Sequence, residues 1–202
     1  LKTNNINHPM KNKIINNMET DLLKIIQYLI NKVPNDKKIW YQKHMAHHLL
    51  LENDLSWIKN FINILLIRNP KKVILSYIKK NALNNILQLG LPQQKQILLF
   101  LKKNNMNYFI IDADDLLNSP KKIIFNLCNN IGFNFNEKML VWDKGKKNYD
   151  GVWGDYWYKN VYNSTGFEKK RGKKIDIKIP KKYLPIYEEA IKYYKYLKKD
   201  GV

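Results

Sequence analysis

The chain has 202 residues, of which 45% are hydrophobic and 26% charged, a globular composition that excludes intrinsic disorder. Its formal net charge is +19, carried by lysines scattered along the whole chain beside many Asn and Ile residues, so we attribute most of the excess to an AT-rich genome and the remainder to an anionic ligand. No apolar run approaches the roughly 20 residues that a membrane-spanning helix requires, and we expect no membrane span.

Two further features concern the cell compartment and the chain start. The single cysteine, Cys128, cannot form an internal disulfide, which indicates a reducing cytoplasm, and its apolar surroundings indicate a core residue. The chain opens at Leu1 instead of methionine, in a stretch with the composition of a loop. We therefore expect a fragment or a processed chain.

Apolar spacing predicts helices that alternate with short buried strands. Helices are expected over residues 20–32, 70–80, 93–103, 120–131 and 184–198, with a helical turn over residues 53–59. Strands are expected over residues 38–43, 61–67 and 108–112. Pro34 ends the first predicted helix, and Pro70 opens the second. Gly132 closes the helix predicted over residues 120–131.

This order predicts a three-layer α/β domain with a mostly parallel sheet and flanking helices. Three strands are few for such a sheet, so we expect a missing N-terminal strand to supply the central one. No internal repeat and no Gly/Ser linker interrupts the chain, and we expect a single domain over residues 1–202.

Arg68 and Ser76 form the first candidate site. Arg68 stands at the carboxyl end of a predicted buried strand, where ligands bind in open α/β sheets, and Ser76 follows eight residues later in the next helix. A guanidinium and a hydroxyl in this arrangement can hold one phosphate. The alternative is purely structural, with an arginine that ends a strand and a small helical residue that packs on the sheet.

A histidine cluster follows the first predicted strand. Lys43, His44, His47 and His48 lie together there, and an imidazole is the natural general base while a lysine can neutralise oxyanion charge. His44 and His48 are spaced i, i+4 and could share a helix face as metal ligands, but no Cys or Glu completes a zinc-like set. A solvated structural cluster is the other alternative.

The segment over residues 150–174 combines glycines, aromatic residues and cations. Its aromatic rings could stack on a base, and Arg171 could meet phosphate. The same composition suits single-stranded nucleic acid, or a tryptophan-anchored loop. Neither G-x-x-x-x-G-K-[ST] nor G-x-G-x-x-G occurs in the chain, so a usual 5′-phosphate loop is not part of it.

Taken together, these motifs resemble those of the sulfotransferases, P-loop-type (P-loop NTPase-like) α/β proteins that use 3′-phosphoadenosine 5′-phosphosulfate (PAPS). The chain is most similar to a bacterial sulfotransferase-like branch with the motifs QKHM-x-HH, LIR-x-P…SY, D-A-D-D-L-L and D-G-x-W…WY…STGF. Here they occupy residues 42–48, 66–77, 112–117 and 150–167, about four-fifths of the chain, in the same order. The family's first strand and 5′-phosphosulfate loop would lie upstream of Leu1, so the resemblance implies an N-terminally truncated domain that is inactive alone.

The resemblance implies transfer of a sulfuryl group from PAPS to a hydroxyl or amine, without a metal. Arg68 and Ser76 would hold the 3′-phosphate, and Lys43 would stabilise charge on the leaving phosphate. Met45 stands where the family has its basic histidine, so we favour His47 as the base, with His44 and His48 as alternatives.

Other functions remain open at this point. They are a kinase or another P-loop-type nucleotide-binding protein, and a non-catalytic nucleotide- or nucleic-acid-binding module; nucleic acid is not the partner we expect. The acceptor could be a small molecule, a carbohydrate or a lipid, and nothing in the sequence chooses among them. The three aspartates at residues 112, 114 and 115 are predicted to end a strand and cap a helix.

Overall fold

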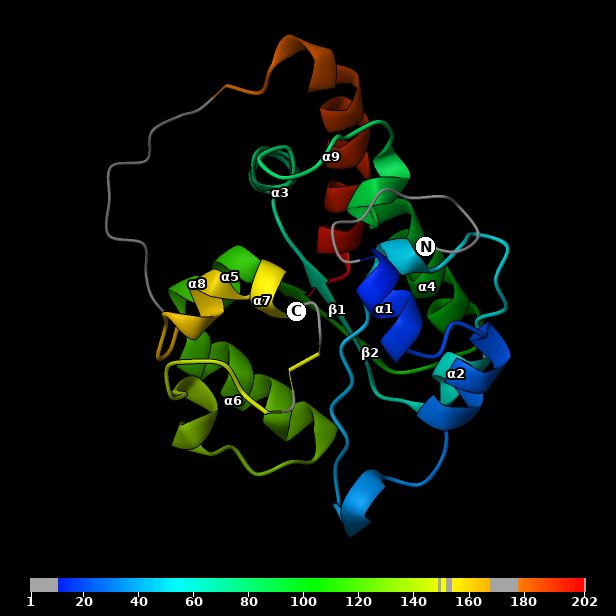
Figure 1. Cartoon of the computed structure of the whole chain (residues 1–202), viewed down its shortest axis with the longest axis vertical. Helices are drawn as coiled ribbons and strands as arrows, with labels where there is room; N and C mark the ends of the chain where they lie inside the picture. Colours follow the sequence, from blue (N-terminus) through cyan, green and yellow to red (C-terminus); the bar gives the residue numbers. More distant parts are fainter. Residues whose placement is uncertain (1–10, 149, 152–153, 168–177, 202) are drawn as a thin grey trace. The chain divides into compact units, whose positions relative to one another are not determined.

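The computed structural model describes residues 11–148, 150–151, 154–167 and 178–201. Its contacts divide the chain into two compact units, which are described separately. The helical unit comprises Leu1–Trp40 and Asn136–Glu168, and the sheet unit comprises Tyr41–Phe135 and Lys169–Val202. Figure 1 labels the elements of both units along the chain.

The helical unit is built from short helices. They are α1 (Lys11–Asn17), α2 (Leu22–Leu29), the 3₁₀ turns η1 (Pro34–Asp36) and η5 (Glu137–Leu140), α7 (Gly154–Trp157) and α8 (Lys159–Tyr162). An isolated antiparallel bridge joins Val141 to Gly166, and the Trp142 indole N–H donates to Ser164 Oγ at 3.0 Å. A tryptophan therefore anchors part of the aromatic segment to its own unit.

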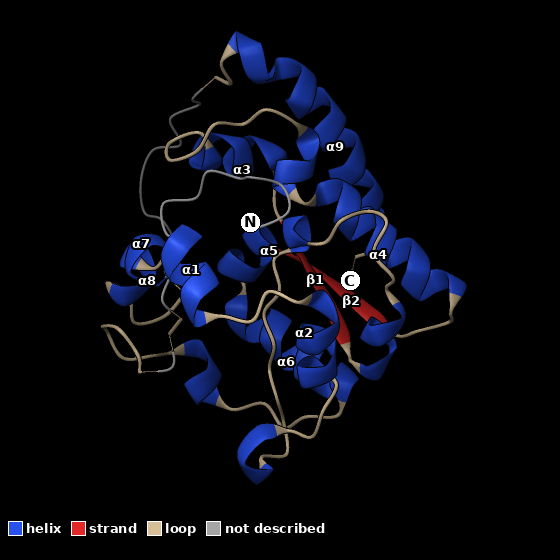
Figure 2. Ribbon diagram, turned by 45° about the vertical axis from the view of Figure 1, so that its right-hand side comes forward, coloured by secondary structure: helices blue, strands red, loops and turns tan. Residues whose placement is uncertain are grey.

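The sheet unit holds the two strands of the described residues. In chain order its elements are η2 (Ala46–His48), η3 (Ser56–Asn60), β1 (Asn63–Ile67), α3 (Pro70–Tyr77), η4 (Ile86–Leu89), α4 (Leu91–Lys103), β2 (Tyr108–Asp112), α5 (Ala113–Asn118), α6 (Pro120–Ile131), η6 (Lys181–Tyr183) and α9 (Leu184–Lys199). The strands are parallel, in register from Asn63 opposite Tyr108 to Ile67 opposite Asp112. Figure 2 shows this small sheet among the helices. The fold is thus mixed α/β, with both strands ending at one edge.

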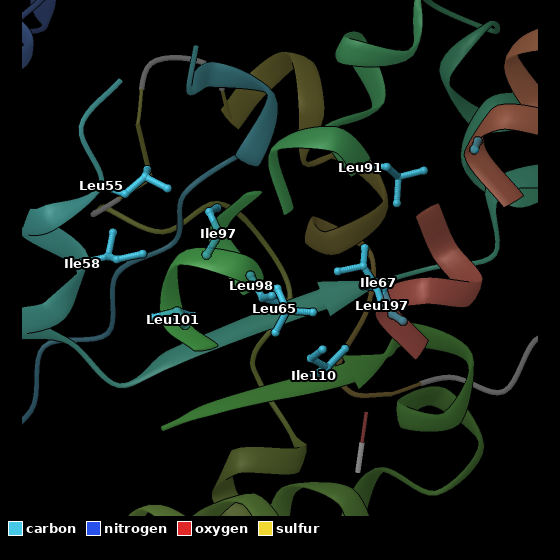
Figure 3. Packing of buried hydrophobic residues seen from close by; sticks show 11 residues of the cluster. Leu55, Ile58, Leu65, Ile67, Leu91, Ile97, Leu98, Leu101, Ile110 and Leu197 are labelled. Atoms are coloured by element: carbon cyan, nitrogen blue, oxygen red, sulfur yellow. The ribbon is translucent and has the colours of Figure 1, made fainter. Parts of the chain in front are cut away.

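The core of the sheet unit lies between one face of this sheet and the helices α4 and α9. Side chains alternate along a strand, so Leu65 and Ile67 of β1 share a face with Ile110 of β2. Leu98 of α4 and Leu197 of α9 are fully buried against them (Figure 3). This packing fixes where the loops at the carboxyl ends of the strands begin.

Several predicted elements are confirmed. β2 and α6 have the predicted bounds, and Gly132 closes α6 with a left-handed φ of 76°. Pro70 opens α3 behind an Asn69 cap, and α4 and α9 lie within two residues of their predicted bounds. The Asp112 carboxylate accepts from the Asp114 backbone N–H at 2.8 Å and so caps α5, as predicted.

The strand predicted over residues 38–43 is wrong, because this segment is a loop. Its residues have high strand propensity, but the Tyr41 side chain is 80% exposed and Ile39 is 54% exposed. Strand propensity reflects packing on a half-buried pleated surface, and these side chains have no such surface to cover. Lys43 therefore follows a loop and not a strand.

Candidate functional site

The carboxyl edge of the two strands carries the candidate site. Arg68 follows the last residue of β1 directly and is half-buried. Its Nε atom is buried and has no hydrogen-bond partner among the described residues. A buried donor without a partner is costly in a folded protein and requires an explanation. A bound anion at this edge is an explanation that suits a guanidinium.

The first turn of α4 reaches the same edge. The Gln94 side-chain amide donates to the backbone carbonyl of Leu66, next to the end of β1, at 2.9 Å. Gly90 precedes α4 with a left-handed φ of 74°. A Cβ atom on Gly90 would lie 3.1 Å from the backbone nitrogen of His47, tighter than nine in ten real Cβ contacts. Because Gly90 has no side chain, the histidine turn η2 can pack directly on the start of α4.

His47 of this turn has a strongly lowered pKa. Burial, and to a smaller extent the neighbouring His48, lower its pKa from 6.5 to about 4. The two rings are 4.4 Å apart and nearly perpendicular, at 78°. His47 is therefore neutral near pH 7, the form in which an imidazole accepts a proton.

His44 lies apart from this pair. Its ring faces the edge of Trp57 at 5.7 Å, and its Nε2 contacts the Gln42 amide oxygen at 3.2 Å. Its i, i+4 relation to His48 does not place the two on one helix face, because η2 is a single 3₁₀ turn that begins at Ala46. In the part of the chain that the structure describes, no three His, Cys, Asp or Glu residues are grouped as metal ligands would be.

The remaining predicted residues are placed as follows. Ser76 lies in the last turn of α3 and is exposed, and Lys43 is exposed in the loop before η2. Within the described residues, no hydrogen bond joins Arg68 to Ser76. Arg171 lies outside the described residues. The turn η2, which carries His47 and His48, packs on the start of α4, and α4 in turn contacts the end of β1 that precedes Arg68. Ser76 lies on α3, the helix that follows this edge.

A polar network that was not predicted lies at the end of β2. The buried Asp112 carboxylate accepts from the Tyr194 hydroxyl and from Lys198 Nζ at 2.9 Å, both on α9. Burial raises the pKa of Asp112, but the hydrogen bonds from Tyr194 and Lys198 outweigh it, and the pKa lies below its ordinary value. Asp112 in turn raises the pKa of Lys198. The i, i+4 spacing of Tyr194 and Lys198 indicates that both lie on one helix face, but it does not indicate that this face meets Asp112.

Gly90 and Gln94 were missed as well. Gly90 lets α4 begin close to η2, and Gln94 joins α4 to the end of β1. These contacts link distant segments, so no local sequence pattern reveals them. None of the helices described here is both long and apolar enough to cross a bilayer.

The chain resembles known proteins along nearly its whole length. The chain is similar to branched-chain-amino-acid aminotransferase-like proteins 2 and 1 of Arabidopsis thaliana, at 28% and 29% identity over 198 residues. These alignments cover 98% of this chain but only 35% of either relative, so the chain spans about a third of their length. No solved structure matches significantly. The family model described as a sulfotransferase domain matches residues 1–200, and the chain therefore belongs to the sulfotransferase domain family.

Proposed function

We propose that this protein transfers a sulfuryl group from PAPS to a hydroxyl or amine of an acceptor. The observation that carries the proposal is the buried Nε of Arg68 at the carboxyl end of β1, which has no hydrogen-bond partner in the part of the chain that the structure describes. A 3′-phosphate would supply the acceptor oxygens that this guanidinium lacks. Membership of the family supports the reaction class, and the position of Arg68 supports the donor.

Each residue of the proposed site has its own role. His47 takes the proton from the acceptor, because it is neutral near pH 7 and lies on the turn that packs against α4. Lys43 stabilises negative charge on the leaving phosphate. Arg68 and Ser76 bind the 3′-phosphate and so fix the nucleotide at a distance from the reacting atoms. Arg171 contributes a further cation for the nucleotide.

The choice of His47 over its neighbours rests on packing. The His44 ring contacts Trp57, and His48 is exposed, whereas His47 is half-buried beside Gly90. A bound nucleotide adds negative charge near His47, which raises the pKa of the imidazole and strengthens it as a base. PAPS supplies the sulfuryl group, whose bond to the 5′-phosphate oxygen breaks as the bond to the acceptor forms.

We propose further that a preceding strand and its 5′-phosphosulfate loop complete the site in a three-layer domain. The opposite face of β1 supports this, since Ile64 and Leu66 are 37% and 55% exposed there. Apolar side chains on a strand are suited to packing beneath another layer. In this account the present residues alone do not catalyse transfer.

Calorimetry on the full-length protein tests the donor assignment. We expect 3′,5′-bisphosphoadenosine to bind at least tenfold more tightly than 5′-AMP, and Arg68→Ala to abolish the difference. Arg68→Lys is the matched control, since it keeps the charge but not the planar fork, and it should retain part of the preference. Equal affinity for the two nucleotides, or a preference for ATP or GTP with magnesium, would refute the 3′-phosphate site and favour a kinase-like protein.

A further inference from the structure

Three carboxylates lie at the carboxyl end of β2, next to the proposed phosphate site in the parallel register. Asp112 is the last residue of β2, and Asp114 and Asp115 lie in the first turn of α5. Asp112 is opposite Ile67 in the parallel register, so Arg68 comes one residue beyond the pair on the adjacent strand. Nonetheless, Arg68 forms no ion pair in the described residues.

Two lysines from other helices pair with these carboxylates instead. Lys198 of α9 lies 2.9 Å from Asp112 and 3.3 Å from Asp115. Lys72 of α3 lies 2.8 Å from Asp114. Every acidic group at this end of β2 therefore has a cationic partner other than Arg68.

The pairing at Asp112 has the largest electrostatic effect. Its side chain is only 3% exposed, so its charge is poorly screened by water. If Lys198 were absent, this buried carboxylate would attract the Arg68 guanidinium and repel a phosphate at the same edge. Asp114, with a side chain 26% exposed, would have a weaker effect.

We propose that Lys198, assisted by Lys72, neutralises the carboxylates after β2 and so keeps Arg68 available for the 3′-phosphate. This inference rests on the proposed function, because it takes Arg68 as the phosphate ligand. Lys198 is a positioning residue: it acts through the charge of Asp112. The last turns of α9 thereby contribute to nucleotide affinity.

Calorimetry with 3′,5′-bisphosphoadenosine on the full-length protein tests the inference. Lys198→Met should weaken binding about fivefold to tenfold, since it leaves the Asp112 charge uncompensated. Asp112→Asn with Lys198→Met should restore nearly the wild-type affinity, because both charges are then absent. Lys122→Met, at an exposed position on α6, removes one positive charge elsewhere and should have little effect.

The outcomes separate electrostatics from folding. If the double variant binds as weakly as Lys198→Met, the loss comes from a displaced α9 and the inference is wrong; unchanged binding by folded Lys198→Met also overturns it. Should Lys198→Met not fold, Asp112→Asn decides, because Asn still caps α5 and binding must then be at least as tight as in the wild type. Weaker binding by Asp112→Asn contradicts the inference.

A failure of the proposed function has a different signature. In that case the wild type itself binds the bisphosphate no better than 5′-AMP, and the inference about Lys198 falls with it. If the wild type prefers the bisphosphate while Lys198→Met keeps the same affinity, the phosphate site stands and only the role of Lys198 is refuted.

Discussion

His47 combines two properties that a surface histidine lacks. Its half-burial in η2 lowers its pKa to about 4, and its backbone nitrogen lies against the start of α4. Burial disfavours the charged imidazolium, so the ring stays neutral through the physiological range. The burial of His47 therefore sets the protonation state of its ring, while its backbone is held against the start of α4.

This lowered pKa predicts a dependence of stability on pH. The unfolded chain binds a proton at His47 below about pH 6.5, whereas the folded chain does so only near pH 4. The contribution of a neutral His47 is therefore fully present above pH 6.5 and is lost as the pH falls toward 4. Urea denaturation should show a decrease on the order of 2 kcal/mol across this range.

His47→Gln is the variant that isolates this effect. It removes the titrating group, so its free energy of unfolding should fall less than that of the wild type between pH 6.5 and pH 4. Burial lowers the pKa of His44 as well, and the difference between wild type and variant removes that contribution. Identical pH profiles for the two proteins would show that His47 is not buried as described.

At the scale of elements, the junction between η2 and α4 positions His47. Gly90 combines a left-handed φ of 74° with a close approach to His47, so that a Cβ atom there would require the neighbour to move by a few tenths of an ångström. Gly132 has nearly the same φ, 76°, but a Cβ atom there would meet nothing within 4 Å. Substitution of Gly132 therefore measures the energetic cost of the left-handed backbone alone, whereas substitution of Gly90 adds the cost of a steric contact.

Alanine substitutions at these glycines should differ in cost. Gly132→Ala should lose about 1 kcal/mol of unfolding free energy, from the left-handed conformation alone. Gly90→Ala should lose about 2 kcal/mol or more, because the new methyl group also displaces His47. Urea denaturation of both variants measures the difference. Equal losses would mean that η2 does not pack against Gly90.

The elements differ in how far the sequence predicts them. The bounds of α6 follow from local signals, namely Pro120 at its start and the left-handed Gly132 at its end. The segment over residues 38–43 carries residues of high strand propensity, but whether a strand forms depends on a partner surface that the local sequence does not encode. Local chemistry therefore predicted the ends of α6, but it could not show that residues 38–43 lack a partner strand.

The same distinction applies to the site. Arg68 was predicted at the end of a strand because a buried apolar run precedes it. Lys198 was not predicted, because it lies 86 residues from Asp112 and meets it only through the packing of α9 on the sheet. His44 and His48 would share a face only if both lay in one α-helix, but the segment forms a single 3₁₀ turn that begins at Ala46.

At the scale of the whole molecule, the proposed site draws its residues from distant parts of the sequence. Arg68 and the carboxylates at the end of β2 lie at one edge of the sheet through the parallel register. His47 lies on η2, which packs on the start of α4, and Gln94 of α4 contacts the end of β1. The family membership indicates a sulfotransferase domain. We propose that Arg68 binds the phosphate and His47 transfers the proton in the same site.

The pKa of His47 in the full-length protein, measured by NMR with and without 3′,5′-bisphosphoadenosine, tests this claim most directly. The account predicts that the pKa rises from about 4 by about one unit or more when the nucleotide binds, and that Arg68→Ala prevents the rise at the same ligand concentration. His44 and His48 serve as internal references, with smaller changes. An unchanged pKa of His47 at saturating nucleotide would contradict the account, because the histidine and the bound phosphates would then lie in separate places.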